Sequence, residues 1–269
     1  MEFATSADGT RIAFQRQGSG EAVLLVHGTI ASNEAWALVA PHLSEHFTVV
    51  AMDRRGHGES EPGPSHATHL EAEDVSAVIE AVGEPVHLVG HSGGGRVVLA
   101  VPQHSDRLLS MVLYEPVIAP QHCPADLADR ADALIREGDR DTAVEAFLRE
   151  AACAADEEIA VMRSLPPVWE RLIADVENGP RDIRTFTAEP IDVEGLRSIT
   201  VPTLILVGSD QDAPIFLDGL DEIENALPHA RRHEFPGQRH FAHAFAPDVF
   251  AEALTSFFVG LNREAQPHA

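Results

Sequence analysis

Five short runs of apolar residues are the feature that most constrains how this chain can fold. They lie at residues 22–27, 48–52, 86–90, 109–114 and 203–208, and polar residues barely interrupt them. Continuous rather than alternating hydrophobicity is typical of strands that are covered on both faces, as in a parallel sheet. The sequence therefore predicts a buried and mostly parallel β-sheet.

Amphipathic helical patterns lie between these runs, at residues 34–43, 70–82 and 247–259. Alternation of strands and helices predicts an α/β fold with a doubly wound sheet, in which helices cover both faces. The first residues, 2–14, have the alternating pattern and the Asp-Gly turn of a β-hairpin.

Residues 117–195 interrupt the alternation. Three helical patterns follow one another without a strand between them, at residues 127–135, 144–151 and 168–176. Asn-Gly-Pro at residues 178–180 is expected to end the third helix. We therefore predict an α/β core formed by residues 1–116 and 196–269, with residues 117–195 as a helical cap over one end of the sheet.

The charge of the chain is strongly negative. It has 43 acidic and 19 basic residues, no lysine, and a net charge of −24. Binding to phosphates or to anionic lipids needs clustered basic residues, so neither nucleic acid nor a membrane is an expected partner. No signal peptide or apolar span is visible, and two cysteines do not make a disulfide framework. A cytoplasmic location is expected.

The segment from residue 86 to residue 100 carries the clearest chemical signal. An apolar run passes through Gly90-His91-Ser92-Gly93-Gly94 into a helical pattern, which is a G-x-S-x-G motif between a strand and a helix. Such a sharp turn strains the serine backbone, and a side chain at Gly90 or Gly94 would collide with neighbouring elements. It also places the serine at a helix N-terminus, which favours developing negative charge. We therefore predict that Ser92 is a nucleophile; the alternative is a serine that only caps the helix.

Three further segments add to this motif. A predicted strand ends in His27-Gly28-Thr29, another is followed by D-R-R-G-H-G-E-S at residues 53–60, and P-G-Q-R-H-F stands at residues 236–241. Together with the serine turn they resemble the α/β-hydrolase superfamily, in its small, cap-bearing, esterase-like branch. The resemblance covers nearly the whole chain except the cap, and it implies a Ser, acid, His order of catalytic residues.

The resemblance implies a role for several residues. Ser92 matches the nucleophile and His240 the catalytic base. The backbone N–H groups of Thr29 and Gly93 match the oxyanion hole. Residues 53–60 resemble a structural loop that holds the edge of the sheet, and we assign them no chemical role.

The catalytic acid is open between three residues. The family usually carries it three residues after the glycine that ends the penultimate strand, and here that residue is Gln211. Asp210 is preferred because its spacing to Pro214 fits relatives, and Asp212 is an alternative that would also suit a helix cap. Glu115 is the third candidate, because some relatives place the acid after the preceding strand.

A serine at this position also narrows the reaction. Haloalkane dehalogenases and epoxide hydrolases of this fold use aspartate there, so we expect a serine hydrolase that acts on a carboxylic ester, lactone or related acyl substrate. The alternatives are a lyase, a cyclisation catalyst or a C–C hydrolase with the same triad, or a non-hydrolytic ligand receptor. Apolar residues expected to line the pocket favour a hydrophobic substrate group; these are Phe147, Trp169, Leu172, Phe186 and Val117.

Neither a cofactor nor a metal ion is expected. His240 and His243 have a spacing that could suggest a metal, but no third and fourth ligands accompany them. His91 is expected to point away from the pocket, and the other histidines are expected at the surface. The expected partner is a small-molecule substrate, and the chain is expected to be a monomer or a homodimer.

Overall fold

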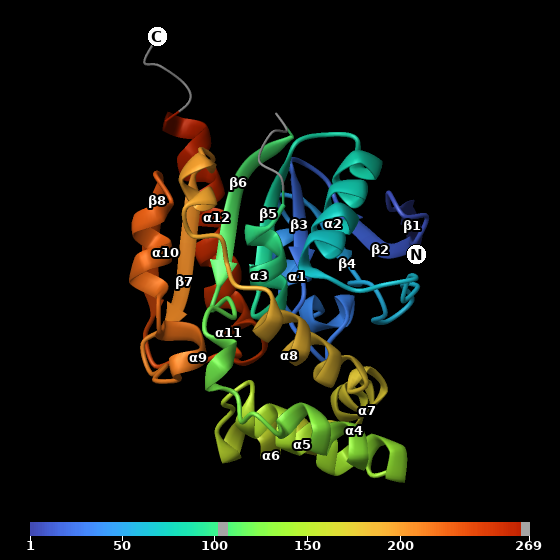
Figure 1. Cartoon of the computed structure of the whole chain (residues 1–269). Helices are drawn as coiled ribbons and strands as arrows, with labels where there is room; N and C mark the ends of the chain where they lie inside the picture. The colour runs from blue at the N-terminus through green and yellow to red at the C-terminus, as the bar shows by residue number, and fades with distance from the viewer. Residues whose placement is uncertain (102–106, 265–269) are drawn as a thin grey trace.

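The computed structural model of this chain describes residues 1–101 and 107–264, and an eight-stranded sheet runs through its middle (Figure 1). The strands lie side by side in the order β1-β2-β4-β3-β5-β6-β7-β8. Strands β1 and β2 are antiparallel to their neighbours, and all pairs from β4 to β8 are parallel. The bounds are Glu2–Thr5, Arg11–Gly18, Ala22–Val26, Thr48–Met52, Val86–His91, Leu108–Tyr114, Thr203–Gly208 and Ala230–Phe235 for β1 to β8.

The five apolar runs form the five central strands, β3 to β7. Nearly every residue in them is buried, because helices cover both faces of the sheet. The resemblance implied a strand after β7, but the bounds of this strand, β8, were not predicted. It lies at the edge of the sheet, and its sequence Ala-Arg-Arg-His-Glu-Phe leaves most of its residues partly or fully exposed. A half-exposed edge strand lacks the apolar run that identifies the central ones.

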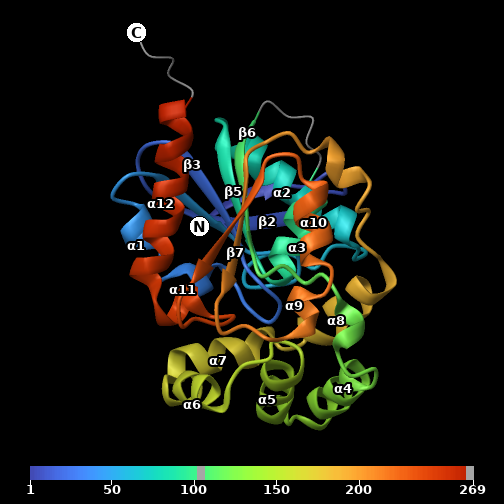
Figure 2. The ribbon, with the colours of Figure 1, turned by 90° about the vertical axis from the view of Figure 1, so that its left-hand side faces the viewer.

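Two groups of helices cover the sheet, one on each face. Helices α2 (Thr68–Val82), α3 (Gly93–Leu99) and α10 (Leu220–Ala226) share one apolar cluster with the strands. The short helices η1 (Asn33–Trp36) and α1 (Ala40–Leu43), with the long α12 (Pro247–Glu264), share the other. Figure 2 shows α1 and α12 on the opposite side of the sheet from α2, α3 and α10. The predicted doubly wound α/β fold is confirmed.

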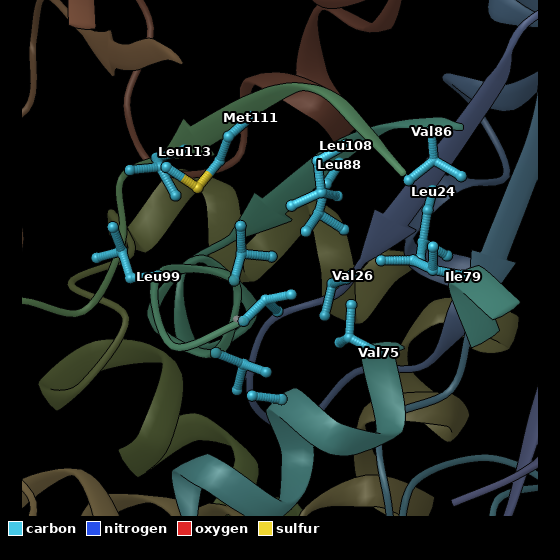
Figure 3. Close-up of a cluster of buried hydrophobic side chains, with 14 of the residues drawn as sticks. Leu24, Val26, Val75, Ile79, Val86, Leu88, Leu99, Leu108, Met111 and Leu113 are labelled. Carbon is cyan, nitrogen blue, oxygen red and sulfur yellow. The ribbon is translucent and has the colours of Figure 1, made fainter. Parts of the chain in front are cut away.

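Helix α2 shows how the sequence pattern becomes packing. Val75, Val78, Ile79 and Val82 recur at helical spacing, all are buried, and the helix ends at Gly83 with a φ of 83°. In Figure 3, Val75 and Ile79 lie against Leu24, Val26 and Leu88 of the sheet. Each such side chain contributes about 1.5–3 kcal/mol when it is fully buried. The helix predicted at 34–43, by contrast, is divided into η1 and α1.

Five helices lie between β6 and β7, beyond the carboxyl ends of the strands (Figure 1). They are α4 (Leu127–Glu137), α5 (Arg140–Glu150), α6 (Asp156–Ser164), α7 (Pro166–Asp175) and α8 (Asn178–Ala188). Short helical turns flank β6 and β7 and precede α12: η2 (Pro120–His122), η3 (Gly195–Ser198), α9 (Pro214–Leu217) and α11 (Ala242–Phe245). No helix within the described ranges has the length and apolar character needed to cross a membrane.

The insertion has two more helices than the three that were predicted, α6 and α8. The third predicted helix, α7, ends at Asp175, just before residues 178–180 as expected, but these residues then begin a further helix, α8. Proline is tolerated in the first turn of a helix, where its missing N–H has no intrahelical partner in any case. The division into a core and a cap domain at residues 117 and 195 stays a prediction.

Polar contacts join the insertion to the loop of residues 53–60. Arg54 forms an ion pair with Asp182 of α8 at 2.9 Å, and both side chains are buried. Asp175, at the end of α7, accepts a hydrogen bond from the Gly58 N–H at 3.3 Å. The second carboxylate oxygen of Asp175 is buried without a partner among the described residues. Burial raises the pKa of Asp175 from 3.8 to about 6.

The pKa of Asp175 predicts how stability changes with pH. The unfolded chain releases this proton near pH 3.8 and the folded chain near pH 6, so stability is lost as pH rises between these values and is constant above them. Asp175→Asn removes the buried charge and should stabilise the fold. The difference between the free energies of unfolding of the variant and the wild type should grow by about 1 kcal/mol from pH 5 to pH 8. Urea unfolding of both proteins at the two pH values measures this, and a gain that shrinks with rising pH would contradict it.

Candidate active site

Ser92 sits in a strained turn between β5 and α3. Its φ of 55° and ψ of −121° are unusual for a residue with a side chain. A Cβ atom on Gly90 would lie 2.7 Å from the Gly94 carbonyl oxygen, and one on Gly94 would lie 2.4 Å from the His27 carbonyl oxygen. The collisions expected at both glycines are therefore confirmed, and the turn needs glycine at these positions.

The backbone of Ser92 is tied to the end of the neighbouring strand β6. Its N–H donates to the Tyr114 carbonyl at 2.9 Å, and its carbonyl accepts from the Val117 N–H at 3.2 Å. The residue is 8% exposed. These bonds fix the serine turn against residues 114–117, which also carry the next member of the site.

Glu115 lies directly against His240. The Glu115 Oε2 atom is 2.7 Å from His240 Nδ1, and both side chains are almost completely buried. The same oxygen accepts a hydrogen bond from the Gln211 amide at 2.6 Å, and Oε1 accepts from the Gly208 N–H at 2.8 Å. Three donors therefore hold this carboxylate in one orientation, behind the imidazole.

The prediction that Asp210 lies beside His240 is wrong. Asp210 is exposed and accepts a hydrogen bond from its neighbour Ser209, and Asp212 forms an exposed ion pair with Arg239 at 2.8 Å. Gln211, between them, is the residue of this loop that turns inward. Its amide donates to Glu115, the third candidate, which occupies the place beside the histidine.

The rest of His240 is held by aromatic and backbone contacts. Its ring stacks on Phe216 with ring centroids 4.1 Å apart, and its carbonyl lies 3.0 Å from Nε2 of His91. Burial, with His243 and His240 nearby, lowers the pKa of His91 well below its usual value. A neutral His91 can donate one hydrogen bond to the carbonyl, which fixes the loop that carries His240.

The expectation that the other histidines lie at the surface is wrong for three of those within residues 1–101 and 107–264. His27, His57 and His87 are buried, and burial lowers the pKa of His27 to about 4. Its Nε2 accepts a hydrogen bond from the Arg54 N–H at 3.0 Å. These imidazoles act as internal hydrogen-bond partners, a role that single histidines in a sequence do not reveal.

A group of possible metal ligands among the described residues lies elsewhere than His240 and His243. His66, Glu71 and Asp182 bring their ligand atoms within 4.8 Å of one another. The guanidinium of Arg54 already pairs with Glu71 at 2.6 Å and with Asp182 at 2.9 Å. A bound cation there would compete with this guanidinium, so the three residues do not suit a metal ion.

The residues predicted for the oxyanion hole lie next to each other. A Cβ atom on Gly93 would be 2.7 Å from Thr29 Oγ1 and 3.1 Å from the ring of Phe186. Val117 and Phe186 belong to one buried apolar cluster with Phe216, the residue that stacks on His240. Of the predicted pocket residues, these two therefore lie beside the site.

The other three predicted pocket residues belong to the apolar cluster of the insertion. Phe147 and Trp169 are buried there, and Leu172 packs against it. The Trp169 indole N–H donates to Asp141 at 2.6 Å. Their role toward a substrate stays a prediction.

Sequence reasoning missed two residues of the site. Gln211 was set aside because it is not an acid, yet its place in the family pattern was the signal that it points into the site, where it binds Glu115. Arg54 was treated as part of a structural loop, although an arginine is rarely fully buried unless its guanidinium group is paired. The structure shows that its side chain is 3.3 Å from the Cβ position of Gly93.

Comparison with known proteins agrees with the fold. The sequence profile of the alpha/beta hydrolase family matches residues 23–253. The chain belongs to the α/β-hydrolase family. A non-heme haloperoxidase from Rhodococcus erythropolis is 29% identical to this hydrolase over 277 residues, which cover 96% of this chain and 99% of that protein.

Solved structures also resemble this hydrolase. An alpha/beta hydrolase from Sphaerobacter thermophilus has a TM-score of 0.82 and 32% identity, with 96% of this chain and 100% of that one covered. An esterase from Exiguobacterium antarcticum has a TM-score of 0.76 and 23% identity, with 95% and 98% covered, and shares the fold.

The contact between Glu115 and His240 predicts which carboxylate matters for hydrolysis. Glu115→Gln should lower kcat/KM for an activated ester by about 10²- to 10⁴-fold, because a neutral amide does not stabilise the imidazolium. Asp210→Asn and Asp212→Asn are matched controls and should stay within about threefold of the wild type. Circular dichroism checks the fold of each variant. Equal losses in Glu115→Gln and Asp210→Asn would overturn the assignment.

Proposed function

We propose that this chain is a serine hydrolase that cleaves a carboxylic ester, a lactone or a related acyl substrate with a hydrophobic group. The nucleophile is Ser92, the base is His240 and the acid is Glu115. The observation that carries the proposal is the 2.7 Å contact between Glu115 and His240, next to a strained serine turn. A serine hydroxyl is a weak nucleophile unless such a base activates it.

In the proposed reaction, His240 takes the proton of Ser92 as its Oγ attacks the acyl carbon. Glu115 holds the proton of His240 on Nδ1, which leaves Nε2 as the base. The described hydrogen bonds do not include one between Ser92 Oγ and Nε2, and such bonds often shorten only when substrate binds. The backbone N–H groups of Thr29 and Gly93 bind the oxyanion.

The acyl-enzyme is then released by water. His240 first gives its proton to the leaving group and then activates a water molecule for attack on the acyl carbon. Each step uses groups of this chain and water, so the proposed reaction needs no cofactor.

The surroundings of the site support a hydrophobic substrate group. Val117, Phe186, Ile215 and Phe216 form a buried apolar cluster beside Ser92 and His240. Apolar walls with a few polar groups are typical of small-molecule sites. The net charge of −24 opposes the approach of anionic substrates over long distances.

Perhydrolysis is a second candidate reaction. It is favoured by the similarity to the non-heme haloperoxidase, which extends over 96% of this chain. Hydrogen peroxide would replace water as the group that attacks the acyl-enzyme, and a peracid would be released. Formation of peracetic acid from an acetate ester and peroxide, measured beside ester hydrolysis, distinguishes the two.

Ser92→Ala should keep the fold and lower hydrolysis of p-nitrophenyl esters by several orders of magnitude, since members of a triad act as a unit. A graded series of esters and lactones gives the preferred chain length. A fluorophosphonate should label the wild type and not the variant, and an initial burst of p-nitrophenol should report the acyl-enzyme.

The same measurements separate the alternatives. Turnover of Ser92→Ala within tenfold of the wild type would remove Ser92 from the mechanism. Labelling of Ser92 without hydrolysis of any ester would favour a lyase, a cyclisation catalyst or a C–C hydrolase. A wild type that neither labels nor turns over would favour a ligand receptor.

A further inference from the structure

The Nη1 atom of Arg54 carries two buried N–H groups that donate no hydrogen bond to any described residue. The Nε and Nη2 atoms of Arg54 bind the Glu71 carboxylate at 2.6 and 2.7 Å, and Nη2 also pairs with Asp182 at 2.9 Å. The Nη1 atom is buried and has no hydrogen-bond partner among the described residues. An unpaired donor on a buried charged group is costly, and native proteins rarely keep one without a use.

The unpaired Nη1 atom faces the serine turn. A Cβ atom on Gly93, the residue that follows Ser92, would lie 3.3 Å from Nη1. The same position is 2.7 Å from Thr29 Oγ1 and 3.1 Å from the Phe186 ring. Because Gly93 has no side chain, this residue puts no side-chain atom between the guanidinium and the serine turn.

The guanidinium is fixed in this orientation from two sides. Glu71 comes from α2 of the core and Asp182 from α8 of the insertion. Although burial opposes its charge, Asp182 and Glu71 raise the pKa of Arg54 above its usual value. Nη1 is therefore a permanent, well-oriented pair of donors.

The charges around Arg54 select the kind of acceptor. Arg181 also binds Asp182, at 3.1 Å, so two guanidinium groups balance the carboxylates of Glu71 and Asp182. A carboxylate on the substrate would add an unbalanced buried charge, which is strongly unfavourable. A neutral carbonyl, ether or hydroxyl oxygen would accept the hydrogen bond without that cost.

An acceptor must move a neighbour to reach Nη1, which is closed to solvent. Thr29 Oγ1 is bound to Asp182 at 3.0 Å, and the Gly93 side of the site is backbone. The ring of Phe186 is near the guanidinium groups of Arg54 and Arg96, at 5.9 and 5.3 Å from its centroid, but no hydrogen bond holds it, so it is the neighbour that would have to rotate away. Substrate binding at Nη1 would therefore displace this ring of α8.

We propose that Arg54 is a substrate-binding residue whose Nη1 binds a neutral acceptor oxygen within a few bonds of the scissile carbonyl. The preferred substrates are thus esters or lactones that carry a second neutral oxygen, such as an ether, ketone or hydroxyl group. This inference rests on the proposed serine hydrolase function, because Ser92 fixes where the scissile carbonyl lies.

Isosteric substrate pairs test the inference. On the acyl side, p-nitrophenyl methoxyacetate is compared with p-nitrophenyl butyrate; on the alcohol side, 2-methoxyethyl acetate is compared with butyl acetate. Each kcat/KM is divided by the rate constant for hydroxide hydrolysis of the same ester. For at least one pair, the oxygen-bearing ester should be preferred about tenfold or more, as for a hydrogen bond to a charged group. The p-nitrophenyl ester of hydrogen succinate, which carries a carboxylate, should not be preferred over p-nitrophenyl butyrate.

A variant and a matched control locate the effect. Arg54→Lys keeps a cation beside Glu71 and Asp182 but removes Nη1, so the preference ratio should fall to about one. Arg181→Lys changes the other arginine that binds Asp182. Arg181 contacts Arg55 and His57 rather than Gly93, so this variant should keep the wild-type ratio. Thermal unfolding confirms that each variant is folded.

The outcomes are distinct. A ratio near one for both pairs in the wild type overturns the inference, even if Arg54→Lys does not fold. A ratio that survives in Arg54→Lys, or a preference for the hydrogen succinate ester, also overturns it. In each of these cases, the proposed function is upheld if the wild type hydrolyses p-nitrophenyl butyrate and Ser92→Ala does not. A wild type that hydrolyses none of the esters would count against the proposed function itself.

Discussion

Parallel pairing of β5, β6 and β7 is the constraint on which the site depends. The register sets His91 beside Tyr114 and Tyr114 beside Leu206, so the residues that follow these strands meet at one edge of the sheet. Ser92 binds Tyr114 through its backbone, and the Glu115 N–H donates to the Leu206 carbonyl at 3.1 Å. Ser92 and the Glu115 carboxylate are thus placed by strand hydrogen bonds, which are among the stiffest parts of a fold.

Buried charge gives the second constraint. Arg54 joins α2 of the core to α8 of the insertion through Glu71 and Asp182. Buried ion pairs contribute little net stability, but breaking one is costly, so this cluster fixes one position for α8 over the strand ends. Phe186 is carried on the same helix and lies against Gly93. The position of this apolar side chain beside the serine turn therefore follows from a polar contact.

The direction of each side chain in the loop after β7 decides which carboxylate lies beside His240. Three successive polar residues, Asp210, Gln211 and Asp212, follow Ser209, and only the middle one is buried. A carboxylate that faces solvent, such as that of Asp210, does not contact the buried imidazole of His240. The amide of Gln211 points inward and donates a hydrogen bond to the carboxylate of Glu115, which follows β6. The spacing of these residues along the chain does not show which way each side chain points.

The sequence by itself determined the central strands, the helices α2, α3 and α12 that cover them, and the serine turn. These features depend on local patterns, namely apolar runs, helical periodicity and glycines at Gly90 and Gly94, which neighbouring residues are enough to interpret. The choice of Glu115 over Asp210, the burial of His27, and the pairing of Arg54 with Asp182 depended on the tertiary structure. Each of them joins segments far apart in the chain, up to 128 residues for Arg54 and Asp182 (182 − 54). Only packing decides which distant side chains share a buried space, because a polar group there must find its partner or lose the solvation of water.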